Sequence, residues 1–136
     1  MSKSTGNVVN PFFALNRFGS DLMRFYLAHD GGLGGDADYD NEYIIARYKK
    51  ALQFGLGNLT SRVVRGKSWN VRRAVETAHS KKLPLENDFD SRQRAQVQAL
   101  PDEVAEQMRR LDPRTAIELI MGMIYNVRSL HLRRNV

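Results

Sequence analysis

The chain has 136 residues, of which 42% are apolar, enough to form the core of one domain. It contains no run of about 18 apolar residues and no signal-peptide pattern, which argues against a transmembrane helix and against secretion. The absence of cysteine excludes disulfides and thiolate metal sites. A net charge of +6 makes nucleic acid the first partner class to consider, although a soluble protein that is merely basic fits this charge equally well.

The N-terminal part predicts a polar loop followed by two short helices. Asn10 and Pro11 form a good helix start, because asparagine caps and proline at the first helical position loses no needed hydrogen bond. Gly19 suits a left-handed helix end, and we expect Ser20 to cap the second helix. One face of that second helix is apolar and is expected to carry Leu22, Phe25, Tyr26 and His29.

A loop and then a long helix are expected next. Residues 30–40 are rich in glycine and aspartate, which predicts a loop, and Asp40 or Asn41 can cap the element that follows. From Asn41 to about Arg65, residues recur at helical spacing, namely Ile44, Tyr48, Leu52, Gly55, Leu59 and Val63.

Two glycines interrupt this helical pattern. Gly55 and Gly57 each weaken an isolated helix by about 1 kcal/mol, so we expect a neighbouring helix to approach closely at these positions. Residues 66–90 are polar and basic, and they predict a connection with one helical turn around residues 73–78.

The C-terminal part predicts two further helices. Ser91 is expected to cap the first, which Pro101 restarts or kinks. Asp112 and Pro113 repeat the combination of cap and proline that starts a helix. The apolar face of the last helix is expected to consist of Ile117, Ile120, Ile124 and Val127.

These elements predict an all-α fold. Residues 1–40 are expected to form a loop and a connecting segment, and residues 41–136 an antiparallel α-helix bundle. The histidines are far apart in sequence and no cysteine accompanies them, so we expect no metal site.

The N-terminus contains side chains suited to phosphate. Lys3 offers a charge and three donors, Ser2 and Ser4 offer hydroxyls, and Gly6 permits close approach of the backbone. The Walker spacing is absent. On this chemistry alone, a flexible polar N-terminus is the better interpretation.

The wider context favours phosphate binding. The stretch MSKSTGNVVNP followed by RFGSDLMRFYL resembles the Lys-Met-Ser-Lys-Ser loop and the Gly-x-Asp-x-x-Arg segment of class I aminoacyl-tRNA synthetases. The resemblance implies catalytic roles for Lys3, Ser2 and Ser4. Lys3 would contact the phosphates of ATP, which is bound as a substrate together with Mg²⁺.

Further segments resemble the methionyl-tRNA synthetases. These are GGDADYDNE, LGNLTSR and the downstream RGKSWNV, the last of which is similar to organellar members. The resemblance implies ATP-dependent charging of methionine tRNA with methionine, in the mitochondrial matrix or alternatively in the cytoplasm. It implies methionine tRNA, ATP and methionine as partners, and no membrane.

Polar residues in and after the long helix are candidates for RNA contact. Asn58 and Arg62 are four residues apart and so share a helix face, which Arg65 continues. An amide and a guanidinium can bond base edges, although in an arbitrary helix such a pair is more often a surface pair. The resemblance implies that Asn58 and Arg62 read the anticodon. Lys67 and Trp69 are weaker candidates, because a lone tryptophan more often packs against a bundle than stacks on a nucleotide.

The resemblance also implies missing parts. The family's nucleotide-binding α/β domain precedes this loop, and nothing in the sequence replaces it, so we expect the chain alone not to activate methionine. A tryptophan that the family places after the last helix has no counterpart here, which puts full anticodon selectivity in question. The bundle is therefore expected to be truncated at its C-terminal end.

Three other interpretations remain open. The chain could be a non-catalytic helical module that binds tRNA or other RNA by charge and shape, with an affinity that falls steeply with salt. It could belong to the isoleucine, leucine or valine type of class I synthetase. It could also be a helical scaffold that binds protein through exposed apolar stripes.

Overall fold

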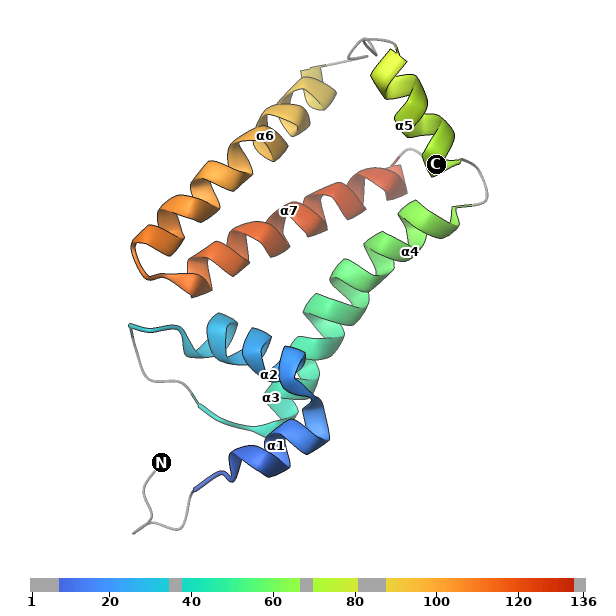
Figure 1. Cartoon of the computed structure of the whole chain (residues 1–136). Coiled ribbons are helices and arrows are strands. Elements are labelled where there is room, and N and C mark those ends of the chain that lie inside the picture. The colour runs from blue at the N-terminus through green and yellow to red at the C-terminus, as the bar shows by residue number, and fades with distance from the viewer. Residues whose placement is uncertain (1–7, 35–37, 67–69, 81–87, 134–136) are drawn as a thin grey trace.

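Every regular element in the described part of the chain is a helix, which confirms the predicted all-α class (Figure 1). The structure is a computed structural model, and it describes residues 8–34, 38–66, 70–80 and 88–133. The helices are α1 (Pro11–Phe18), α2 (Ser20–Tyr26), η2 (Leu27–Gly31), α3 (Asn41–Arg47), η3 (Tyr48–Gly57), α4 (Asn58–Arg65), α5 (Val71–Ser80), α6 (Asp88–Arg109) and α7 (Pro113–Arg133).

The start and end of α1 are as predicted. The Asn10 side chain accepts a hydrogen bond from the Phe12 amide at 2.9 Å, and Pro11 occupies the first helical position. Gly19 ends the helix with φ +78°, a conformation that glycine adopts without the steric cost of a side chain. The prediction for Ser20 was wrong, because Gly19 is the cap and Ser20 already lies within α2, without a capping side-chain bond.

The first core lies between α1, α2 and α3. Tyr26 is 3% exposed, and its ring meets that of Tyr39 edge-on at 6.5 Å. His29 is buried one turn further along, with its ring 5.6 Å from that of Phe25, as the predicted face requires. The buried members of this core are Ala14, Met23, Tyr26 and Ile44, and Phe18, Leu22 and Tyr39 pack against them.

Residues 41–65 form one continuous helix, as predicted (Figure 1). Asp40 caps it, because its carboxylate accepts a hydrogen bond from the Glu42 amide at 2.6 Å. The middle segment, η3, is π-helical, which the sequence did not predict. In a π-helix each carbonyl bonds five residues ahead instead of four, and an apolar stripe of helical spacing does not distinguish the two.

The two glycines of this helix differ in their surroundings. A Cβ built on Gly55 would lie 3.1 Å from Met121 Cε and 3.2 Å from a ring carbon of Tyr125, both in α7. This confirms the close approach predicted at Gly55. The prediction is wrong for Gly57, where the nearest atom is the carbonyl oxygen of Leu52 in the same helix, at 3.1 Å.

The segment after the long helix is more helical than predicted. Instead of one turn around residues 73–78, α5 covers ten residues. Asn70 stabilises its start, since its side chain accepts a hydrogen bond from the Arg73 amide at 3.0 Å.

The predicted start of α6 was also wrong. The helix begins at Asp88, so Ser91 lies inside it and is not its cap. The helix continues through the exposed Pro101, which therefore does not restart it.

A tight turn joins α6 and α7 into an antiparallel hairpin (Figure 1). Leu111 has φ +58°, and its amide donates to the Met108 carbonyl at 3.1 Å. The Asp112 amide donates to the Gln107 carbonyl at 2.9 Å. This bond pair is the Schellman motif, with leucine where glycine is usual. The Asp112 carboxylate then caps α7, as predicted, by accepting from the amide (3.0 Å) and hydroxyl (2.7 Å) of Thr115.

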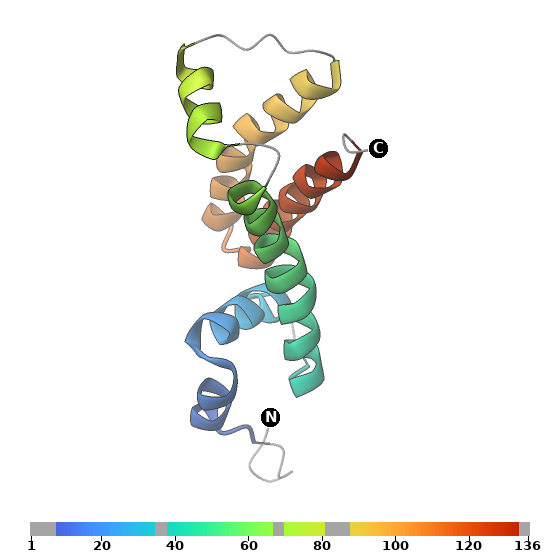
Figure 2. The same ribbon diagram turned by 90° about the vertical axis from the view of Figure 1, so that its right-hand side faces the viewer.

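Helix α7 packs on α6, η2 and η3. Its most buried residues are Ala116 and Met121, at 2% and 5% exposure, whereas Ile120 of the predicted apolar face is 39% exposed. The molecule is elongated, with α1 at one end, α5 at the other and the helix of residues 41–65 between them (Figure 2). No helix in the described part of the chain is long and apolar enough to cross a membrane.

Candidate nucleic-acid interface

The structure brings the two main RNA-contact candidates together on α4. The Nε atom of Arg62 donates a hydrogen bond to the side-chain oxygen of Asn58 at 3.0 Å, one turn earlier. This confirms that both side chains share a helix face. The bond occupies one guanidinium donor, and the terminal nitrogens of Arg62 make no hydrogen bond to another described residue. The Asn58 amide group keeps its two N–H donors.

The pair lies at the border of the packed face of α4. Asn58 and Arg62 are both half-buried, as are their neighbours Leu59 and Val63, while Thr60, Ser61, Val64 and Arg65 are exposed. Helix α4 is in contact with α7. Partial burial limits the rotamers available to both side chains, so the pair is held ready for a ligand at a reduced entropic cost.

Side chains of α7 hold the π-helical segment that precedes the pair. The Tyr125 hydroxyl donates to the Lys50 carbonyl at 3.2 Å, and Arg128 Nη1 donates to the Phe54 carbonyl at 2.7 Å. The Arg128 guanidinium also lies 5.8 Å from the centre of the Tyr125 ring. Sequence reasoning missed these contacts, because the partners are 74 and 75 positions apart.

The remaining candidates are less well defined by the structure. Arg65 is exposed at the end of α4 and continues the line of Asn58 and Arg62, seven residues after Asn58. Lys67 and Trp69 lie outside the described residues, as do Ser2, Lys3 and Ser4.

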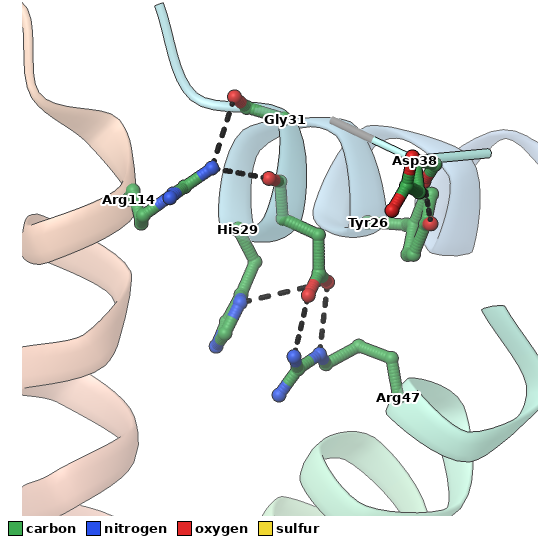
Figure 3. Close-up of polar contacts among 7 residues, drawn as sticks. Tyr26, His29, Gly31, Asp38, Arg47 and Arg114 are labelled. Atoms are coloured by element: carbon green, nitrogen blue, oxygen red, sulfur yellow. Dashed lines mark hydrogen bonds and ion pairs between the residues drawn. The ribbon is translucent and has the colours of Figure 1, made fainter. Parts of the chain in front are cut away.

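A second polar cluster, which sequence reasoning missed, connects η2 with α3 and α7 (Figure 3). The Arg47 guanidinium binds the Asp30 carboxylate through Nε at 2.8 Å and Nη2 at 2.5 Å. Arg114 Nη2 donates to the backbone carbonyls of Asp30 and Gly31, the latter at 3.2 Å. His29 Nδ1 lies 3.5 Å from the Asp30 carboxylate without forming a hydrogen bond to any described residue. We call Asp30, Arg47 and Arg114 the Asp30 cluster.

The buried neighbours of this cluster are held neutral. Burial, and secondly the positive charge of Arg47, lower the pKa of His29, which the carboxylates of Asp30 and Glu118 only partly oppose. Burial is likewise the main cause that raises the pKa of Tyr26, whose hydroxyl donates to the Asp38 carbonyl at 2.8 Å. Both pKa shifts thus favour the uncharged forms of His29 and Tyr26.

An open hollow of about 500 Å³ borders the Asp30 cluster. The guanidinium groups that reach it, those of Arg47 and Arg114, are bound to Asp30 and to backbone carbonyls. No three metal-binding side chains gather within the described ranges. The cluster therefore has the character of a structural junction, whereas Asn58 and Arg62 keep donors for a ligand.

Comparison with known proteins identifies the family. Residues 1–64 match the family model described as tRNA synthetases class I (M). A probable mitochondrial methionine–tRNA ligase of Neurospora crassa is 45% identical over 130 residues, which cover 91% of this chain and 21% of that protein. The chain belongs to the methionine group of class I tRNA synthetases. This confirms the family resemblance inferred from the motifs.

Other members of the methionine group match about half of the chain. A probable mitochondrial methionine–tRNA ligase of Dictyostelium discoideum is 44% identical over 70 residues, covering 52% of this chain and 12% of that protein. The methionine–tRNA ligase of Clostridium acetobutylicum is 47% identical over 62 residues, covering 46% of this chain and 10% of that protein. The chain thus spans about a fifth or less of the length of these relatives. The family-model match includes Asn58 and Arg62.

Proposed function

We propose that the chain contributes to the ATP-dependent charging of methionine tRNA with methionine, and that α4 reads the anticodon. Family membership supports the reaction. The observation that carries the role of α4 is the 3.0 Å bond between Arg62 and Asn58, which presents an amide and a guanidinium as one preformed unit.

The chemistry of this unit fits an unstacked base. Arg62 uses Nε to hold Asn58, which leaves the outer edge of its planar guanidinium for the acceptors of a base edge. Its flat face can also stack on a base. The Asn58 amide adds donors beside it. Arg65, exposed one step further along α4, supplies a charge suited to a backbone phosphate.

The N-terminal loop has the ATP-binding role in this proposal. Lys3 contacts the phosphates of ATP, bound with Mg²⁺, and Ser2 and Ser4 add hydroxyl donors, so that negative charge developing during amino-acid activation is stabilised. The family-model match over residues 1–64 includes this loop and supports the assignment. Lys67 and Trp69 are proposed as auxiliary RNA contacts.

The proposed division of labour follows the predicted domains. Residues 1–40 form the loop and a connecting segment, and residues 41–136 form the anticodon-binding bundle. We place the protein in the mitochondrial matrix, because relatives from Neurospora crassa and Dictyostelium discoideum are named mitochondrial. Detection of the chain inside purified, protease-treated mitochondria tests this location, and its absence there would favour the cytoplasm.

Binding to paired tRNAs tests the role of α4. The purified chain is titrated with methionine tRNA and with the same tRNA carrying an altered anticodon, each at low and at high salt. We expect binding of the native tRNA to be on the order of tenfold tighter, a difference of about 1.4 kcal/mol. The slope of affinity against salt should be the same for both, because phosphate contacts are shared. Equal affinity with a steep salt dependence would favour a non-catalytic RNA-binding module.

A further inference from the structure

The Asp30 cluster connects the N-terminal helices to the helix that carries Asn58 and Arg62. We propose that Asp30 is a positioning residue, which fixes the direction of α4 relative to the segment of residues 8–31. The inference rests on the proposed function, because it concerns how the anticodon-reading helix is held relative to the segment that follows the ATP-binding loop.

The contacts of Asp30 restrict rotation as well as distance. Its carboxylate accepts two hydrogen bonds from Arg47 in a fork, and both side chains are largely buried, at 24% and 26% exposure. A two-pronged bond between planar groups fixes their relative angle, which a single bond does not. The backbone carbonyl of the same residue accepts from Arg114 in α7. One residue therefore holds two helices at once.

A glycine makes room for the second of these contacts. Gly32 has φ +62°, and a Cβ built on it would lie 3.4 Å from Arg114 Nε. The guanidinium consequently lies close against the backbone while its Nη2 reaches the carbonyls of Asp30 and Gly31 (Figure 3). This places the start of α7 directly on the end of η2.

Both held helices lead to the anticodon-reading pair. Arg47 is the last residue of α3, and the helix continues without a loop through η3 into α4, so a change of angle at Arg47 is transmitted to Arg62. Helix α7 also holds η3 further along, through Tyr125 and Arg128. The direction of α4 is thus determined by two routes that meet at Asp30.

The chain contains a matched carboxylate without this connecting role. Glu106 pairs with two arginines, Arg109 and Arg110, at 2.8 Å each, but all three lie in or directly after the last turn of α6. Replacing Glu106 removes a carboxylate that binds two guanidinium groups, whereas the Asp30 carboxylate binds one, and it disconnects no separate elements. Glu106→Gln is therefore the control for Asp30→Asn.

A distance measurement within the chain tests the inference without RNA. The sequence has no cysteine, so Asn16→Cys on α1 and Ser61→Cys on α4, both at exposed positions, accept one spin label each. We expect electron–electron resonance to give one narrow distance distribution in the parent and in Glu106→Gln. In Asp30→Asn the distribution should become on the order of twofold broader or shift. A distribution as narrow and as centred as that of Glu106→Gln would overturn the inference.

A second variant tests the inference if Asp30→Asn does not fold. If circular dichroism shows that Asp30→Asn does not fold, Arg47→Lys takes its place, because lysine keeps the charge but cannot form the fork. A broader distance distribution in folded Arg47→Lys supports the inference, and a parent-like distribution in that variant overturns it.

Binding to the paired tRNAs separates this inference from the proposed function. If the parent discriminates between the two tRNAs, Asp30→Asn should lose most of a roughly tenfold preference while its salt dependence stays unchanged. Full retention of the preference in folded Asp30→Asn would overturn the positioning role. If the parent itself does not discriminate, the proposed function fails, and the distance measurement still decides whether Asp30 fixes α4.

Discussion

At the scale of single residues, the proposed function gives Arg62 two tasks that a simple charge could not perform together. Its Nε holds Asn58, and its remaining nitrogens stay available on the same rigid plane. A lysine would keep the positive charge but would lack the planar guanidinium group. The distinction between charge and geometry can therefore be tested at this position alone.

The first prediction is that Arg62→Lys loses anticodon discrimination but keeps general affinity. We expect the preference for methionine tRNA over the anticodon-altered tRNA to fall by about tenfold, because a lysine cannot hold Asn58 and a base edge together. Equilibrium titration measures both affinities. Arg110→Lys, at an exposed position directly after α6, serves as the control and should leave the preference unchanged. A preference retained in Arg62→Lys would show that only charge acts at this position.

His29 gives a prediction for pH. Burial and Arg47 lower its pKa in the folded chain below the ordinary value of 6.5. As pH falls below about 6.5 the unfolded chain binds a proton before the folded chain does, so stability decreases until the folded pKa is reached. The pKa values of Glu106 and Asp112 are also lowered, but from 4.5 and 3.8, so their contributions are lost only at more acidic pH.

The free energy of unfolding should therefore decrease between about pH 7.5 and about pH 5.5. Urea titrations at the two pH values measure the change. His29→Gln should reduce the decrease, whereas His79→Gln, which alters an exposed residue of α5, should not. A decrease of the same size in His29→Gln would show that another group is responsible.

At the scale of elements, the turn between α6 and α7 holds a leucine in a conformation that suits glycine. Leu111 has φ +58° and is 71% exposed, so its side chain gains little from burial. Leu111→Gly should raise the free energy of unfolding by about 0.5–1 kcal/mol, since relief of the left-handed strain exceeds the added entropy of the unfolded chain. Leu111→Ala keeps the Cβ and should bring no such gain in a urea titration. Equal stability of the two variants would contradict this reading of the turn.

The contact of α7 with η3 depends on Gly55. A Cβ there already lies 3.1 Å from Met121 Cε, so Gly55→Val should destabilise the chain by about 2 kcal/mol through overpacking. Gly122 is the control, because a Cβ built on it meets nothing within 4 Å, and Gly122→Ala should stabilise α7 by up to about 1 kcal/mol. Chemical denaturation of both variants measures the difference. If Gly55→Val left the free energy of unfolding unchanged, α7 would be able to move away from η3.

The structural features that could be predicted from the sequence depend on residues that lie close together along the chain. The caps at Asn10, Asp40 and Asp112 each bond an amide two or three positions later, so a short pattern contains all the information needed. Helix α5 was underestimated, because residues 66–90 lack a clear apolar period. The π-helical winding of η3 was not predicted either. Its apolar residues recur clearly at helical spacing, but that spacing fits both an α-helix and a π-helix.

In the candidate site, too, contacts could be predicted only between residues that are close in the sequence. Asn58 and Arg62 could be paired from their spacing of four. Arg47 and Arg114 could not be assigned to Asp30, because they lie 17 and 84 positions away and no periodic pattern connects them. Only packing of the whole chain brings these groups together.

At the scale of the whole molecule, the elongated shape separates the two proposed tasks. Helix α1, which follows the proposed ATP-binding loop, lies at one end, and the long helix leads away from it toward α4 (Figure 2). The Asp30 cluster lies where these parts meet. A tRNA whose anticodon is read at α4 must therefore be extended if its other end is to reach the proposed ATP-binding loop.

Cleavage of bound tRNA from a probe beside Arg62 tests directly whether α4 lies against the anticodon. Because the chain has no cysteine, Ser61→Cys accepts one iron chelate that releases hydroxyl radicals next to the pair. The same chelate on Glu103→Cys, an exposed position of α6, is the control. We expect cuts in the anticodon loop of methionine tRNA from position 61 and not from position 103. Cuts at the acceptor end, or the same weak pattern from both positions, would contradict this expectation.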